Sequence, residues 1–211
     1  MRHMAIKPIL FNTEMVRAIL DGRKDATRRI VKGFIPDDAV WGYTAFTPKG
    51  YISCRGTFAD GYGEKFFKLP CEPGDILYVR ETWKKAPNGY YYYEDWQRND
   101  IADITKWKPS IHMPKEATRI WLKVMNVRVE RLQEITDEQA KREGIQYDEC
   151  PTGFTWKQET DMHNCYTTPI GAMQALWNST IKKSDLDRYG WDASPWVWVI
   201  EFEWCEKPEG V

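Results

Sequence analysis

The segment TRIWLKVMNVRVERL, residues 118–132, decides the fold class. Its apolar residues alternate with polar ones, and it is rich in β-branched side chains, as in a strand with one face in a core. The alternation changes phase near Met125-Asn126, which predicts a β-bulge at that point. A second long strand is predicted at Trp196–Trp204, where Pro195 opens the run. The sequence is therefore organised around long strands.

Shorter strands are predicted on either side of this pair. One is Ile6–Phe11, and another begins at Ile76, runs to Arg80 and continues to Trp83. The turn residues Pro73-Gly74-Asp75 precede the second of these. Asn88-Gly89 predicts a tight hairpin between two further short strands.

Three helices are predicted between the strands. The first runs from about Glu14 to Asp21, with a cap at Asn12-Thr13 and an end at Gly22. The second follows the capping-box pattern of Thr136–Gln139 and ends at Gly144. The third spans Pro169–Ile181. Strands with few helices between them favour a mainly β fold, a small barrel with added helices, over a doubly wound sheet.

Charge and aromatic content limit the possible partners. The chain has 30 Lys and Arg against 31 Asp and Glu, for a net charge of -1. Proteins that hold long nucleic acid by charge alone are usually more basic, so a nucleic-acid contact must be local, or the ligand must be small. The 11 Trp and 11 Tyr are suited either to filling a β core or to stacking on bases.

The cysteines indicate a reducing compartment. The five of them match no disulfide framework, no signal peptide precedes them, and no apolar stretch reaches the length of a membrane helix. We therefore expect a cytoplasmic protein that does not enter a membrane. Cys150, His163 and Cys165 lack the paired spacings of a zinc site, so we expect neither a metal nor a cofactor. The sequence also lacks the usual phosphate-binding loops, serine elbows and histidine pairs.

Two polar features are candidates for chemistry. Lys24 and Thr27 follow the first helix and would share a face if one more helical turn persisted. An ammonium beside a hydroxyl can bind a phosphate or a carbonyl oxygen, and a neutral lysine could take the hydroxyl proton. Glu143 lies at the negative end of its helix, where a carboxylate is disfavoured unless a cation such as Lys24 pairs with it. A solvated basic turn and a tolerated surface acid are the alternatives.

A second group of residues could hold the ligand. Arg23, Arg28 and Arg29 make the turn after the first helix basic. Arg80 and Trp83, at the end of a strand, could hold a phosphate and a base at a barrel mouth. Otherwise Arg80 pairs with a surface acid and Trp83 belongs to the core.

At these positions the chain resembles the ASCH family, a branch of the PUA-like superfamily. The resemblance rests on Gly22-Arg23-Lys24 with Thr27, on Gly74-Asp75-Ile76-Leu77, on the helix that ends at Glu143, and on Val199-Ile200-Glu201-Phe202. The chain is also similar to ASCH proteins of phages and prophages, including their Pro-Trp-Val-Trp ending at 195–198. The family implies a PUA-like barrel. A bacterial member hydrolyses N4-acetylcytidine with a lysine, a threonine and a glutamate, which by motif correspond to Lys24, Thr27 and Glu143.

The resemblance implies one domain over residues 1–211, with insertions near 34–72, 84–117 and 147–170. It predicts that the cleft binds a nucleoside or a nucleic acid, RNA more than DNA, and it leaves amidohydrolase activity on an N4-acylated cytosine nucleoside open. Asp25, next to Lys24, could hold the lysine in its charged form. The alternative role is a phage-encoded interaction module that acts on a host protein through its aromatic insertions.

Overall fold

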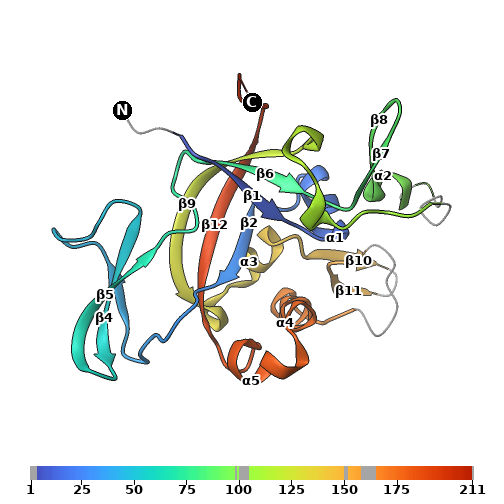
Figure 1. Ribbon diagram of the computed structural model, residues 1–211. Coiled ribbons are helices and arrows are strands. Elements are labelled where there is room, and N and C mark those ends of the chain that lie inside the picture. The colour runs from blue at the N-terminus through green and yellow to red at the C-terminus, as the bar shows by residue number, and fades with distance from the viewer. Residues whose placement is uncertain (1–3, 98, 100–104, 150–151, 158–164, 211) are drawn as a thin grey trace.

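A five-stranded sheet forms the centre of the molecule in the computed structural model, which describes residues 4–97, 99, 105–149, 152–157 and 165–210 (Figure 1). The strand order is β1-β6-β9-β12-β2, and only the β1–β6 pair is parallel. The strand bounds are β1 Ile6–Leu10, β6 Ile76–Arg80, β9 Trp121–Arg131, β12 Trp196–Cys205 and β2 Ala26–Ile30. The described chain has more strand than helix, 38% against 25%, which confirms a mainly β fold with added helices.

The long antiparallel pair β9–β12 has the predicted irregularity. Glu201 lies opposite Asn126 and Phe202 lies opposite Val124, so Met125 is the extra residue of a bulge. A bulge bends its strand and increases the local twist.

The sheet does not close into the predicted barrel. Within the described chain, the edge strands β1 and β2 share no backbone hydrogen-bond ladder. They are joined instead by a side chain, because Arg29 Nη2 donates a hydrogen bond to the carbonyl of Leu10 at 3.0 Å. The sheet is therefore curled and open at one seam.

Three smaller sheets surround the central one. A lobe consists of β3 Val40–Gly42, β4 Tyr51–Phe58 and β5 Gly61–Lys68. The hairpin of β7 Trp83–Ala86 and β8 Gly89–Tyr92 confirms the predicted Asn-Gly turn, and it shows that β7 is separate from β6. The third sheet pairs β10 Gln146–Glu149 with β11 Thr152–Thr155.

The helices begin where the sequence predicted caps. Asn12 Oδ1 accepts the Met15 N–H at 2.9 Å and starts α1, Thr13–Leu20. Thr136 and Gln139 form the predicted capping box of α3, Asp137–Arg142. The other helices are α2 Tyr93–Gln97, α4 Pro169–Thr180 and α5 Leu186–Tyr189, with short 3-10 turns at 110–112, 115–117, 132–134 and 183–185.

One hydrophobic cluster connects these parts. It contains Val16 from α1, Leu122 from the sheet, Leu176 from α4, Ile52 from the lobe, and Leu69 directly after the lobe. Half of the large hydrophobic side chains that are exposed in the described chain lie in the lobe or in the segments before β3 and between its strands: Phe34, Val40, Tyr43, Phe46, Tyr62 and Phe66. The prediction of a partner surface on the aromatic insertions stays a prediction. Among the described helices, none has the length and apolar character needed to cross a membrane.

Candidate functional site

The end of α1 directs the chain toward the site. Gly22 has a φ of +71°, which lets the chain reverse, and the carbonyl of Ala18 accepts the N–H groups of Arg23 and Lys24 at 2.8 and 3.0 Å. The chain then continues in extended conformation into β2, and the further helical turn considered from the sequence does not form. Thr27 therefore does not share a helical face with Lys24.

The end of α3 meets this segment by backbone pairing. Lys24 and Glu143 form an antiparallel bridge, and the Asp25 N–H donates to the carbonyl of Arg142 at 3.0 Å. Gly144 makes the approach possible. Its φ is +103°, and a Cβ at that position would lie 2.8 Å from the Cβ of Ala18. The pairing brings residues 119 positions apart into one site.

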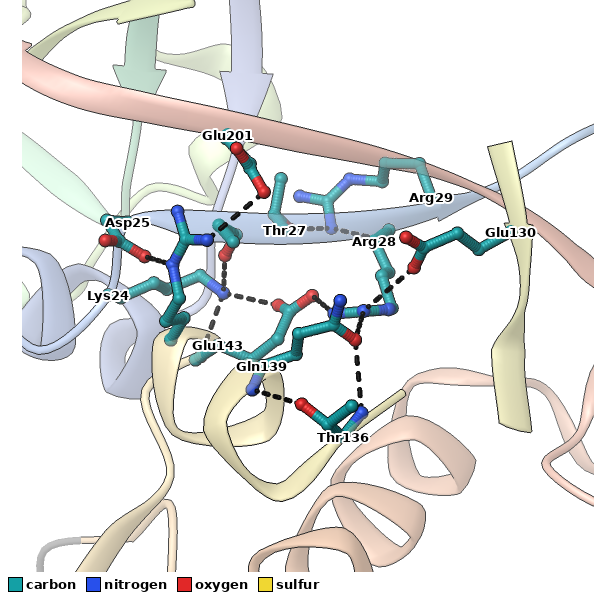
Figure 2. A network of polar contacts seen from close by, with 12 residues as sticks. Lys24, Asp25, Thr27, Arg28, Arg29, Glu130, Thr136, Gln139, Glu143 and Glu201 are labelled. Atoms are coloured by element: carbon teal, nitrogen blue, oxygen red, sulfur yellow. Dashed lines mark hydrogen bonds and ion pairs between the residues drawn. The ribbon is translucent and has the colours of Figure 1, made fainter. Parts of the chain in front are cut away.

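Lys24 is enclosed by three acceptors (Figure 2). Its Nζ donates to Glu143 Oε2 at 2.7 Å, to the Ala26 carbonyl at 2.8 Å and to the Glu143 carbonyl at 2.9 Å. Only 4% of the residue is exposed. An ammonium has three N–H donors and no acceptor, so this arrangement matches the charged form. The predicted pairing of Glu143 with Lys24 is confirmed.

Glu143 is shared between two cations. Its second oxygen, Oε1, accepts from Arg28 Nη1 at 3.0 Å. Arg28 Nη2 also donates to Gln139 Oε1 at 3.0 Å and to Glu130 Oε2 at 3.3 Å. Gln139 belongs to the capping box of α3, so the helix cap and the site share one polar network (Figure 2).

Thr27 is oriented by Arg29. The hydroxyl oxygen of Thr27 accepts from Arg29 Nη1 at 2.8 Å, and the same nitrogen donates to the carbonyl of Arg28 at 3.0 Å. Both the guanidinium of Arg29 and the ammonium of Lys24 lie within 6 Å of the Phe11 ring, at 5.2 and 5.6 Å from its centroid. Thr27 is buried, and with its oxygen held by Arg29, its hydroxyl hydrogen can be offered to another acceptor.

Burial lowers the pKa of Lys24 below its ordinary value. The carboxylate of Glu143 opposes this shift, whereas the charges of Arg29 and Arg28 add to it. Asp25, which the sequence suggested as the charge partner, binds Arg142 Nε at 2.8 Å instead. Among the described residues that shift the pKa of Lys24, Glu143 is the one carboxylate.

The polar groups line a small cavity of about 70 Å³ that borders a larger groove of about 380 Å³. Lys24, Thr27 and Glu143 line only the inner cavity, whereas Arg28 and Arg29 line both spaces. Leu10, 44% exposed, lines the outer groove, which therefore reaches solvent. Typical small-molecule sites measure roughly 300–1,000 Å³, so the groove can hold the body of a ligand and the cavity only a small group.

The remaining predicted site residues lie elsewhere. Arg23 donates to the carbonyl of Gly144 at 2.9 Å and pairs with Asp21. Arg80 donates to the carbonyls of Met113 and Ile111. Trp83 is buried in a separate cluster with Met113, Ala117, Tyr90 and Tyr92. None of the three lines the cavity or the groove, and a ligand-binding role for them stays a prediction.

The apolar wall of the site was not predicted. Met173, Leu176 and Trp177 of α4 line the inner cavity opposite Phe11 and Met15. Their helical spacing predicted a core-facing helix, and most of this face is indeed in the core. Nothing in the sequence distinguishes a core face from a cavity wall.

The described residues contain no group of three or more His, Cys, Asp or Glu that could hold a metal. Cys150 and His163 lie outside the described residues. Comparison of the chain with protein families, curated proteins and solved structures gives no match.

Proposed function

We propose that the cleft binds a cytosine nucleoside and hydrolyses the amide of an N4-acyl group on its base, in the manner of the ASCH family that the sequence resembles. One observation carries the proposal. An ammonium, a hydroxyl and a carboxylate, from Lys24, Thr27 and Glu143, line the same cavity beside a groove of ligand size. These are the three residues that the family resemblance selects.

The dimensions support a division of the ligand between the two spaces. The inner cavity of about 70 Å³ suits a short acyl group, with apolar side chains of α4 and α1 around its methyl end. The groove of about 380 Å³ suits the base and sugar. The exposed end of the groove admits a free nucleoside, or a cytosine turned out of single-stranded RNA, rather than a base within a duplex.

The charges support an electrophilic role for Lys24. Its ammonium can stabilise the oxyanion that forms when the acyl carbonyl is attacked. Thr27, oriented by Arg29, can position the attacking water with its hydroxyl hydrogen. The substrate carbonyl takes the place of the Glu143 carboxylate at Lys24, and the carboxylate then accepts a proton from the attacking water. Glu143 delivers that proton to the leaving N4. The products are the carboxylic acid and the free cytosine nucleoside.

Release of cytidine from N4-acetylcytidine tests the proposal. We expect wild-type turnover, and we expect Lys24→Met and Thr27→Val to lower kcat/KM by about 10²-fold or more, the usual effect of removing an oxyanion donor or a positioned proton-transfer group. Lys141→Gln is the matched control, because it removes an exposed cation of α3 that does not line the cavity. Far-UV circular dichroism checks that each variant is folded. Wild-type turnover no faster than that of folded Lys24→Met would refute hydrolysis at this site.

A further inference from the structure

The positive charge that lines the site exceeds the negative charge that contacts it. The described lining residues include three cations, Lys24, Arg28 and Arg29. The carboxylates within contact of these cations are Glu143, shared by Lys24 and Arg28, and Glu130, bound to Arg28. Arg29 is left over, and the described chain provides no carboxylate oxygen within 4.0 Å of its guanidinium nitrogens.

Within the described part of the chain, the hydrogen-bond acceptors of Arg29 are all neutral. These are the hydroxyl of Thr27 and the carbonyls of Arg28 and Leu10. A guanidinium has five N–H donors, and these three hydrogen bonds leave two of them, on Nε and Nη2, for another group. The side chain is half-buried and lines both the cavity and the groove, so its charge faces the space that the ligand would enter.

Arg28 also has an N–H donor without a hydrogen-bond partner in the described chain. Its residue is 3% exposed, yet its Nε has no hydrogen-bond partner among the described residues. Buried charged donors are normally satisfied, so this unpartnered donor, on a residue that lines the groove, indicates a missing acceptor. Asn12, the N-cap of the eight-residue helix α1, lines the same groove, and the positive end of a helix dipole favours an anion there.

We infer that the outer groove contains a subsite for one anionic oxygen group, and that the preferred ligand is a nucleoside monophosphate rather than a neutral nucleoside. This inference rests on the proposed function for the nucleoside part, whereas the anion subsite rests on Arg29, Arg28 and the N-terminus of α1. The phosphate oxygens accept from the free N–H groups of the two arginines. The base and its acyl group then point toward Lys24 and Thr27.

Binding measured by calorimetry, without turnover, tests the subsite. The four probes are cytidine, cytidine monophosphate, inorganic phosphate and acetate, the last of which stands for the carboxylate product. For the wild type we expect the monophosphate to bind about tenfold or more tightly than cytidine, as charge-assisted hydrogen bonds suggest. We expect this advantage to shrink as salt screens the charges, and we expect phosphate alone to bind more tightly than acetate.

Arg29→Gln should reduce the affinity for the monophosphate to that for cytidine, since glutamine removes the charge. Lys141→Gln, which removes an exposed cation of α3 outside the groove, should leave both unchanged. Equal affinities of wild type for cytidine and its monophosphate would overturn the inference, as would an Arg29→Gln variant that loses both equally. Phosphate binding that depends on Arg29 without any cytidine binding would keep the subsite and reject the nucleoside. Cytidine binding without a contribution from phosphate would keep the nucleoside and reject the anion subsite.

Discussion

At the scale of single residues, the contacts of Lys24 determine what the site can do. Its three N–H donors are matched by three acceptors, two of them on Glu143. A lysine in this setting has no lone pair to offer, so it acts as a cation toward a developing oxyanion rather than as the base that takes the Thr27 proton. The sequence could not distinguish these roles, because two of the three acceptors belong to a residue 119 positions away.

Removal of Glu143 should cost much more stability than removal of an ordinary surface acid. Glu143→Ala leaves the buried charges of Lys24 and Arg28 without their shared carboxylate, and breaking a buried pair in this way typically costs about 3–5 kcal/mol. Urea denaturation measures the change in the free energy of unfolding. Glu138→Ala, an exposed acid on the same helix, is the control and should change it by about 0.5 kcal/mol or less.

The double variant Lys24→Met/Glu143→Leu separates the cost of unpaired charge from the loss of packing. Apolar residues in place of a buried pair are often neutral or stabilising, so the double variant should be more stable than Glu143→Ala. A loss no larger for Glu143→Ala than for Glu138→Ala would contradict the role of Glu143 as the shared partner of two buried cations.

At the scale of elements, the features that the sequence predicted correctly are those that neighbouring residues determine. The caps of α1 and α3 depend on side chains within three residues of the backbone groups that they bind, and both are confirmed. The bulge at Met125 is confirmed because the phase of alternation is also local. Whether a helical turn would persist at Lys24–Thr27 could not be decided from neighbouring residues, because pairing of β2 with β12 imposes extended backbone there. The polar site residues were therefore predictable as candidates, whereas their geometry was not.

The turn before β6 should make the stability of the folded chain depend on pH in the acid range. Asp75 is buried and accepts the N–H groups of Ala5 and Glu72 at 3.2 and 3.0 Å and the ammonium of Lys7 at 3.0 Å. Burial by itself would raise the pKa of Asp75, but these donors outweigh it and hold the pKa below the ordinary value. The carboxylate thereby ties the start of β1 to the turn before β6.

Because the pKa of Asp75 is lower in the folded chain, its stabilisation is complete above the unfolded value of about 4 and is lost as the pH falls through the folded value. Asp75→Asn should therefore be less stable than the wild type at pH 7, by about 1–3 kcal/mol, and the difference should shrink steadily below about pH 4. Urea midpoints at several pH values measure this difference. A difference that stays constant from pH 7 into the acid range would show that the charge of Asp75 contributes nothing.

At the scale of the whole molecule, the described parts of the insertions do not line the site. The residues that line the cavity and the groove come from the ends of β1 and α1, from β2, from Glu143 and from α4. The described residues within 34–72, 84–117 and 147–170 provide none of them. The closure of the barrel could not be judged from sequence either, because it depends on pairing between β1 and β2 across an edge, which no local pattern encodes.

The lobe nevertheless packs directly against the sheet. Trp41 of β3 contacts the rings of Trp196 and Trp198 on β12, with centroids 5.7 and 6.3 Å apart. Ile52 and Leu69 belong to the hydrophobic cluster that also includes the central strands. Opening of the lobe would expose these shared contacts, so we expect the lobe and the sheet to unfold together rather than one after the other.

The two buried thiols can report on this cooperativity, because one lies in each part. Cys54 lies in β4 of the lobe and Cys71 lies at the approach to β6. Burial raises the pKa of Cys54 to about 11 and that of Cys71 to about 12, so neither thiol reacts while its surroundings stay closed. Labelling in increasing urea, with each cysteine followed by mass spectrometry, should show the same denaturant dependence for both thiols. Cys205, which is only partly buried, should react before unfolding and serves as the control for reagent access. If Cys54 is labelled at low urea while Cys71 remains protected, the lobe opens on its own, and the contacts of Trp41 with β12 do not join it to the core.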